Sequence, residues 1–219
     1  MYTYNLHAHT LLSDGQLLPS EVAVRYMAAG YKVLALTDHA DYSNIKTMLK
    51  ATVEFCRKWP KGSDIQILPG VELTHLPPEQ FKPLASFARK QGAKIIIAHG
   101  ETTVEPVVKE TNKLALLADI DILAHPGLIS DDDTKLAATR GIFLEITSRR
   151  GHSDTNKHVI KQARAFGAKL ILNNDSHNPE DIIPAGELFN VGIKTGLTEI
   201  EIEKINLDVM NLLKKRGIR

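Results

Sequence analysis

Seven short runs of apolar residues recur along the chain, and most are continuous stretches of Val, Ile, Leu and Ala. Continuous runs without polar alternation are typical of strands covered on both faces, as in parallel α/β sheets. The pattern therefore predicts a parallel sheet with helices on its outside. The predicted strands are residues 4–9, 33–38, 65–72, 94–99, 122–124, 141–147 and 169–173.

Segments with helical periodicity lie between these strands. Pro78 and Pro106 suit first helical turns, where a missing N–H costs nothing. Gly30, Gly92 and Gly167 suit the positions that follow helix C-termini. The predicted helices are residues 19–29, 44–59, 78–91, 106–118, 131–138, 154–166, a segment near 183–188, and 199–215.

The alternation of strand and helix predicts one α/β domain over residues 1–219, because no linker or low-complexity tract divides the chain. Seven such units favour a closed or nearly closed barrel. An open doubly wound sheet is the alternative, but it gathers only the strand ends near one crevice. Chemistry-bearing residues end nearly every strand here. Only a ring brings all of those ends to one mouth.

Composition narrows the function. The chain of 219 residues is 43% hydrophobic and 24% charged, with a formal net charge of +1, so no strong field indicates a nucleic-acid or membrane partner. No apolar run approaches the roughly 18 residues of a membrane helix, and no signal peptide is recognisable before His7. The single cysteine, Cys56, cannot form an intrachain disulfide. We expect a cytoplasmic protein.

The ends of the apolar runs carry metal-binding residue types. His7 and His9 are spaced i and i+2, which places both side chains on one face of a strand. Histidine, aspartate or glutamate follows most other runs in the same way, and six of the nine histidines of the chain belong to the set. The candidate ligands are His7, His9, Asp14, His39, Glu72, His99, His125, Asp175 and His177.

Imidazole and carboxylate ligands suit borderline divalent cations such as zinc, manganese or iron. Nine ligands are too many for one ion, and at about three or four per ion they can hold two or three. Such a site can activate water and stabilise the leaving oxygen of a phosphate ester. The sequence therefore predicts a polynuclear metal site.

The order of these motifs resembles the PHP (polymerase and histidinol phosphatase) superfamily. The motifs are HAHT, SDG, TDH, GVE, two isolated histidines after strands, and DSH, spread over residues 4–177. The resemblance implies a distorted (β/α)7, TIM-like barrel with a trinuclear site at its C-terminal mouth. Relatives carry His or Asp at the position of Asp14.

The resemblance also implies how the ligands divide among the ions. His7, His9, Glu72 and Asp175 would bind the first ion and form the catalytic core. Glu72 would bridge to a second ion held by His99 and His125. The third ion would be held by Asp14, His39 and His177.

The expected activity is that of a metal-dependent phosphoric ester hydrolase, most simply a histidinol-phosphatase-like enzyme. A hydroxide activated at the trinuclear site would attack a small-molecule phosphomonoester. Arg149 and Arg150 follow the sixth predicted strand and could clamp its phosphate. His152 lies nearby and could contact the substrate or donate a proton to the leaving alkoxide.

Two residues are expected to act behind the ligands. Asp38 precedes a ligand and would bond a ligand imidazole, with a capping role as the alternative. Glu145 ends the sixth predicted strand and would contact the substrate or a ligand, with a buried structural pairing as the alternative.

Two other functions fit parts of the pattern. Barrels with the HxH pattern on the first strand also resemble amidohydrolases, which cleave C–N or C–O bonds. The DxH ending and the lack of an evident lysine at a strand end weigh against this reading. A PHP domain can also serve as a non-catalytic, metal-stabilised module, which would predict bound metal without turnover.

Overall fold

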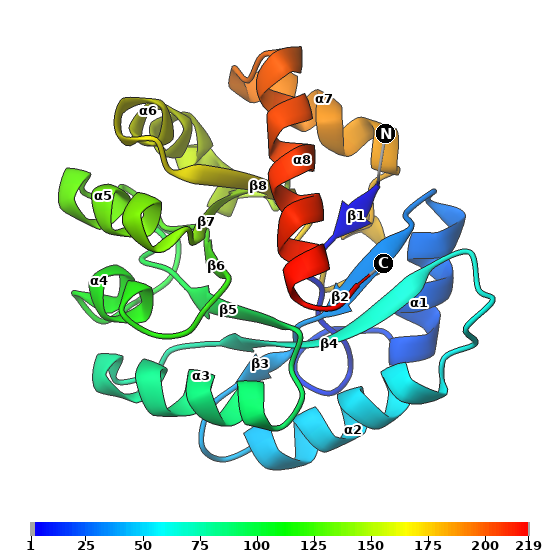
Figure 1. Cartoon of the computed structure of the whole chain (residues 1–219). Helices are drawn as coiled ribbons and strands as arrows, with labels where there is room; N and C mark the ends of the chain where they lie inside the picture. The colour runs from blue at the N-terminus through cyan, green and yellow to red at the C-terminus, as the bar shows by residue number, and fades with distance from the viewer. Residues whose placement is uncertain (1–2, 219) are drawn as a thin grey trace.

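A computed structural model describes residues 3–218 and contains a parallel sheet curled into a nearly closed barrel, with helices around its outside (Figure 1). The strand order is β1-β2-β4-β5-β6-β7-β8, and the short β3 continues the line of β2 beside β4. The distorted seven-stranded TIM-like barrel predicted from the sequence is confirmed. The strands are β1 (Tyr4–Asn5), β2 (Val33–Leu36), β3 (His39–Ala40), β4 (Gln66–Leu73), β5 (Ile95–His99), β6 (Ile122–Ala124), β7 (Phe143–Thr147) and β8 (Lys169–Asn173).

Eight α-helices and three 3-10 turns connect these strands within the described residues. The predicted helix 78–91 divides into a 3-10 turn, η1, and the helix α3. The bounds are α1 (Pro19–Ala28), α2 (Ile45–Lys58), η1 (Pro78–Gln80), α3 (Phe81–Lys90), α4 (Thr111–Leu116), α5 (Asp131–Arg140), η2 (His152–Thr155), α6 (Asn156–Phe166), η3 (Pro179–Asp181), α7 (Ala185–Thr195) and α8 (Glu199–Lys215).

The core explains the apolar runs. Residues of β2, β5 and β6 are buried at almost every position, with Ile95, Ile96 and Ile97 completely inaccessible to solvent. One face of each strand lines the barrel interior and the helices cover the other face. Side chains on both faces are therefore shielded from water. This is why the strands read as continuous hydrophobic stretches.

The barrel closes between the segment that follows β1 and the segment that follows β8. Ala8 forms a parallel bridge with Ser176. The amide of His9 donates to the carbonyl of Ser176 at 2.9 Å, and the amide of Asp175 donates to the carbonyl of His7 at 3.1 Å. The closure thus lies among predicted metal ligands.

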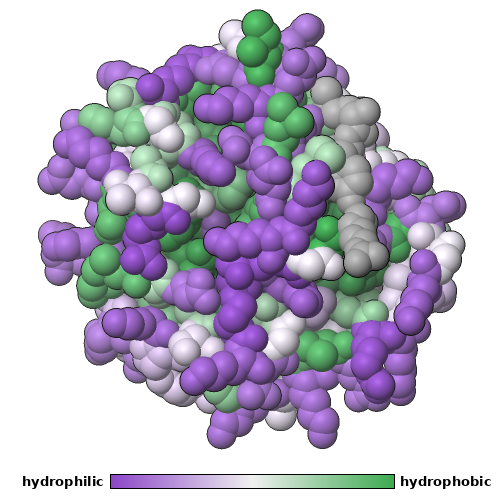
Figure 2. All heavy atoms as spheres, viewed as in Figure 1, coloured by the Kyte–Doolittle hydropathy of each residue, from purple (hydrophilic) through white to green (hydrophobic). Residues whose placement is uncertain are grey.

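Helix α8 covers the opposite, N-terminal end of the strands and lies across the ring in Figure 1. Lys169, which begins β8, pairs with Asp208 of α8 at 3.1 Å. The outer surface of this end is mostly hydrophilic, with only scattered apolar groups (Figure 2). No helix of the described chain combines the length and the apolar character needed to cross a bilayer.

Some predicted bounds were wrong. Pro106 does not begin a helix, because residues 101–110 form an irregular loop and α4 begins only at Thr111. The first strand is also shorter than predicted, since His7 and His9 lie in extended chain beyond β1. The predicted C-terminal glycines Gly30, Gly92 and Gly167 do adopt positive φ.

Candidate metal centre

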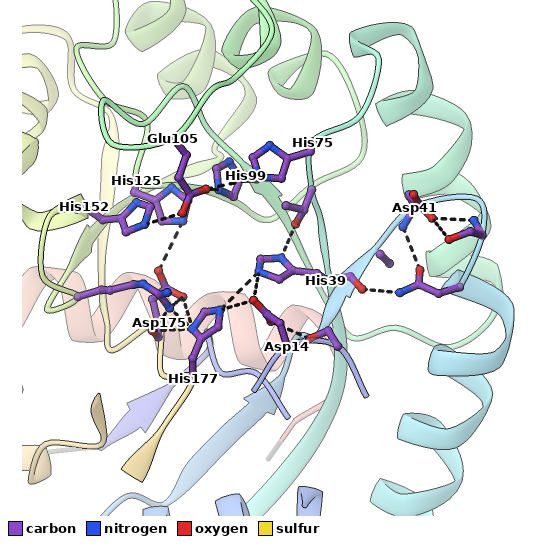
Figure 3. A pocket seen from close by; sticks show the side chains of 16 residues that line it. Asp14, His39, Asp41, His75, His99, Glu105, His125, His152, Asp175 and His177 are labelled. Carbon is purple, nitrogen blue, oxygen red and sulfur yellow. Dashed lines mark hydrogen bonds and ion pairs between the residues drawn. The ribbon is translucent and has the colours of Figure 1, made fainter. Parts of the chain in front are cut away.

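The predicted ligands all lie at the C-terminal mouth of the barrel. His39 is on β3, Glu72 is next to last on β4, and His99 ends β5. The strand register places His39 directly beside Glu72. The others follow strand ends. Six of the nine line a cavity of about 450 Å³ (Figure 3), namely Asp14, His39, His99, His125, Asp175 and His177, whereas His7, His9 and Glu72 are not among the lining residues.

Two of the ligands that follow strands adopt unusual backbone conformations. His125 has a φ of 27° and Asp175 a φ of 54°. Such conformations cost of order 1–3 kcal/mol for residues other than glycine and cluster at functional sites. At each position the turn brings a side chain from the end of a strand into the barrel mouth.

The innermost side chains converge on one carboxylate pair. His7 Nε2 lies 3.3 Å from Glu72 Oε2, and His9 Nε2 lies 3.5 Å from the same oxygen. The same two nitrogens lie 3.5 and 3.4 Å from Asp175 Oδ1. The i and i+2 spacing of the two histidines therefore does bring both rings to one point.

Two further groups lie on either side of this centre. On one side, donor atoms of Glu72, His99 and His125 all lie within 4.8 Å of one another. On the other side, Asp14 Oδ2 lies 3.6 Å from His39 Nε2 and 3.4 Å from His177 Nε2. The structure thus brings all nine predicted residues to one mouth. The clusters of donor atoms overlap, because His9 lies with His7 and Asp175 and also with Asp14, His39 and His177, so the division among three ions stays a prediction.

Burial leaves several of these atoms without hydrogen-bond partners among the described residues. Both ring nitrogens of His9, Nε2 of His7 and both carboxylate oxygens of Glu72 are buried in this way. A buried polar atom without a partner costs about 1–3 kcal/mol, and more when it is charged. The donor set is that of a zinc, manganese or iron site, so these residues fit divalent cations.

The charges within the cluster shift the pKa values of His7 and His9 in opposite directions. Burial opposes charge on His7, but the carboxylates of Glu145, Asp175 and Glu72 outweigh it and raise its pKa well above the usual value. Burial, together with the neighbouring His39 and His177, holds the pKa of His9 well below the usual value.

The pKa values of the carboxylates Asp175 and Glu72 are also shifted in opposite directions. Burial raises the pKa of Asp175 to about 6. The pKa of Glu72 is well below normal, because the charges of His7 and His39 outweigh its complete burial. Both shifts favour an ionised Glu72 beside a charged His7.

Glu145 holds two ligands from behind. Its Oε1 accepts hydrogen bonds from His7 Nδ1 and Asn173 Nδ2, both at 2.8 Å, and its Oε2 accepts from the amide of His125 at 3.2 Å. The bond from Nδ1 leaves His7 Nε2 facing Glu72 and Asp175. Such a bond fixes the tautomer of a ligand histidine and raises its basicity.

Asp38 does not bond a ligand imidazole, so that prediction was wrong. Residues 37 and 38 interrupt the strand between β2 and β3, and the Asp38 side chain bonds the loop that follows His9. Its Oδ1 accepts from the amide of Thr10 at 2.7 Å and from the hydroxyl of Ser13 at 2.9 Å. Asp38 therefore caps the loop that carries Asp14.

The predicted substrate contacts divide. Arg149 and His152 line the cavity, and Arg149 Nη1 lies 3.5 Å from Asp175 Oδ1. Arg149 also bonds the carbonyl of Asp175 and the ring of His177. Arg150 is exposed and is absent from the cavity lining, so its contact with a phosphate stays a prediction.

Sequence reasoning missed Glu105, an acidic residue of the cavity. Glu105, in the loop after β5, lies 3.1 Å from His99 Nε2, 3.4 Å from His75 Nε2 and 3.3 Å from His152 Nε2. The hydrogen bond from His99 lowers the pKa of Glu105 to about 2. Its position in a loop at the mouth of a barrel was the available signal.

Residues 5–121 match the PHP domain family. This chain belongs to the PHP domain family. An uncharacterised protein of Methanocaldococcus jannaschii, MJ1295, is 43% identical over 97% of this chain and 99% of its own length. A protein named "Probable phosphatase" from Thermoanaerobacter sp. is 25% identical over 93% of this chain and 89% of its own.

A further relative in sequence and two solved structures of similar fold have other named functions. The DNA polymerase/3'-5' exonuclease PolX of Bacillus subtilis is 27% identical over 98% of this chain, which spans 39% of that protein. The fold resembles that of histidinol phosphate phosphatase from Lactococcus lactis, crystallised with zinc, L-histidinol and phosphate. The TM-score is 0.52 at 17% identity, covering 99% of this chain and 94% of that one. A Xaa-Pro dipeptidase has a TM-score of 0.64 at 12% identity, covering 99% and 76%.

Proposed function

We propose that this PHP protein is a metal-dependent phosphoesterase that hydrolyses a small-molecule phosphomonoester, in the manner of a histidinol phosphatase. Two or three divalent cations, zinc, manganese or iron, would bind at the barrel mouth. The names of the relatives and the zinc and phosphate in the L. lactis enzyme support this assignment.

The observation that carries the proposal is the set of buried atoms without partners on His7, His9 and Glu72. These atoms face one another at 3.3 to 3.5 Å, and desolvating them without compensation costs free energy. A cation among them offsets that cost, because the lone pairs then have a positive charge to face. A purely structural cluster would have its polar atoms paired within the chain.

The proposed division of the ligands is the one that the resemblance to the PHP family implies. His7, His9, Glu72 and Asp175 would hold the first cation, and Glu72 would also reach the second. His99 and His125 would complete the second position, while Asp14, His39 and His177 would hold the third. When bound, the cations supply Lewis-acid stabilisation of phosphoryl oxygens and lower the pKa of bound water.

The protein's own side chains bind and orient the phosphate. The Arg149 guanidinium lines the cavity beside Asp175 and would hold nonbridging oxygens through two N–H groups. Glu145 fixes the orientation of His7. Burial lowers the pKa of His152, so its ring is mostly neutral near pH 7. This suits a hydrogen bond to the substrate better than donation of a proton to the leaving group.

The test is release of phosphate from a panel of phosphomonoesters that includes histidinol phosphate. The protein is assayed with zinc, manganese or iron, with and without a chelator. Activity should vanish on chelation and in His9→Ala. His158→Ala is the matched control, because the His158 ring bonds the carbonyl of Ile129 outside the cavity. If the fully metallated protein turned over none of these esters, the proposal would be wrong.

The likeness in fold to the Xaa-Pro dipeptidase supports a second candidate, hydrolysis of C–N or C–O bonds. No lysine lines the cavity in the described chain, so a carbamylated-lysine metal bridge has no candidate there. Adding dipeptides and lactones to the same panel separates the two activities. Bound metal with a raised melting temperature and no turnover would instead indicate a non-catalytic module.

A further inference from the structure

One more histidine and one more carboxylate extend the cluster of predicted ligands toward solvent. His75 lies two residues beyond β4, and Glu105 lies in the loop of residues 100–110. In Figure 3 both side chains point into the cavity beside His99. We call His75, His99 and Glu105 the rim group; its two outer members are not among the nine ligands predicted above.

The rim group has the spacing of a coordination sphere. Donor atoms of its three residues all lie within 4.8 Å of one another. Glu105 Oε2 is 3.1 Å from His99 Nε2 and 3.4 Å from His75 Nε2. Ligand atoms about 2.0–2.2 Å from a tetrahedral zinc ion are separated from one another by about 3.3–3.6 Å. The rim group is therefore close to a zinc-binding arrangement.

The backbone holds both outer members in place. His75 has a φ of 50°, a left-handed conformation that it shares with His125 and Asp175 of the metal centre. The loop that carries Glu105 is fixed at its base by Asn112. The Asn112 Oδ1 accepts from the amide of Glu101 at 2.9 Å, and its Nδ2 donates to the carbonyl of Pro126 at 2.9 Å.

His99 belongs to two groups of ligands. Its Nδ1 donates to the carbonyl of Gly100 at 3.0 Å, which leaves Nε2 as the one nitrogen available to a cation. His99 belongs to the rim group and also to the inner group with Glu72 and His125. With Nδ1 bonded to Gly100, it has only Nε2 to offer to either group. Because one lone pair binds one cation at a time, the two positions are filled in turn.

Exposure sets the order in which they are filled. The side chains of His75 and Glu105 are 49% and 36% exposed. Those of His125 and Glu72 are 2% and 0% exposed. A cation that arrives from solvent therefore meets the rim group before it reaches the inner position.

We propose that the rim group is an entry site for divalent cations, which bind first to His75, His99 and Glu105 and then pass to Glu72, His99 and His125. The inference rests on the metal-binding part of the proposed function. His99 stays attached during the transfer, while the carboxylate of Glu105 is exchanged for that of Glu72. The same path serves the outward direction, so it governs exchange as well as loading.

The experiment measures exchange of bound zinc in the full-length, zinc-loaded protein. Excess zinc of a single stable isotope is added, and the isotope content of the protein is followed by mass spectrometry. The variants are Glu105→Gln and His75→Asn, since asparagine tolerates a left-handed backbone. Glu110→Gln is the matched control: it removes the same charge from the same loop, but Glu110 pairs only with Lys113.

All of the proteins should contain the same amount of zinc at equilibrium. One cation should exchange about tenfold more slowly in Glu105→Gln and His75→Asn, because the path loses a ligand and, for Glu105, a steering charge. Glu110→Gln should exchange at the wild-type rate. Unchanged exchange in both rim variants, or a zinc content lower by one ion, would overturn the inference alone. A wild-type protein without zinc would overturn it together with the proposed function.

Discussion

Two buried carboxylates at opposite ends of the barrel have opposite surroundings. Asp121, just before β6 at the N-terminal end, accepts from Arg216 Nε at 2.9 Å, from Arg89 Nη2 at 2.8 Å and from the amide of Ile96 at 2.9 Å. Glu72, at the mouth, is surrounded by histidines and has no hydrogen-bond partner for either oxygen among the described residues.

The difference separates a structural charge from a functional one. Asp121 ties β5 and α3 to the end of α8, and every contact it needs is supplied by the chain. Glu72 would gain its missing partner from the proposed cation. A buried carboxylate whose oxygens receive hydrogen bonds from the chain, such as Asp121, holds the fold together. A buried carboxylate that lies among histidines and receives no hydrogen bond from the described residues, such as Glu72, has the features of a binding site.

The largest expected effect is that of Glu72→Gln on turnover. The substitution removes the charge that two proposed cation positions share, so phosphatase activity should fall on the order of 10³-fold or more. Steady-state kinetics with metal analysis of the same sample measures it. Full activity with unchanged metal content would show that Glu72 is as structural as Asp121.

Asp121→Asn should have the reverse profile. It leaves Arg89 and Arg216 without their shared carboxylate, and both are partly exposed, so unfolding free energy should fall by about 3 kcal/mol, the lower end for a broken buried pair. Denaturant unfolding measures this loss, which should be the same with and without chelator. Turnover per folded molecule should stay at the wild-type level; a loss of metal affinity would contradict the comparison.

Glu145→Gln tests the support behind the metal centre. Glu145 accepts from three donors, and an amide would turn an N–H toward at least one of them. Cation affinity should fall about 10–100-fold, as is typical when the partner of a ligand histidine is changed. Competition with a chromophoric chelator measures it, with Glu110→Gln as the control. An unchanged affinity would reduce Glu145 to a packing role.

The smallest effect expected is that of pH on cation binding. Asp175 has a pKa of about 6 and His7 a pKa well above normal in the metal-free protein. Cations compete with those protons, so affinity should fall as the pH falls, by about tenfold per unit where one proton is displaced. Calorimetry in buffers of different ionisation enthalpy counts the protons released at pH 7. Zero protons would contradict this account.

The folded state has its own pH dependence, with a definite sign. A carboxyl group whose pKa is raised in the folded protein binds its proton more tightly there than in the unfolded chain. The contribution of Asp175 to the stability of the metal-free protein is therefore greatest below about pH 4 and is lost as the pH rises through about 6.

Much of the site could be predicted because its residues end apolar runs. The strands β6 and β8 and the helix α8 have the predicted bounds, since uninterrupted apolar runs and a clear helical period mark them. Once the strands are placed in a ring, the residues at their ends must share one mouth.

Loops were where prediction failed. Pro106 is compatible with a first helical turn, but Glu105 beside it reaches three histidines, and those tertiary contacts outweigh local propensity. Asp38 was misplaced because a break between β2 and β3 cannot be read from an apolar run.

The closure of the barrel between Ala8 and Ser176 also determines when the site can form during synthesis. During synthesis, His7 and His9 emerge at the start, but Asp175 and His177 emerge only after about four-fifths of the chain. Most of the polypeptide must therefore leave the ribosome before all nine predicted ligands can come together. A fragment that stops short of β8 would keep many of the histidines but not the enclosure that gathers them.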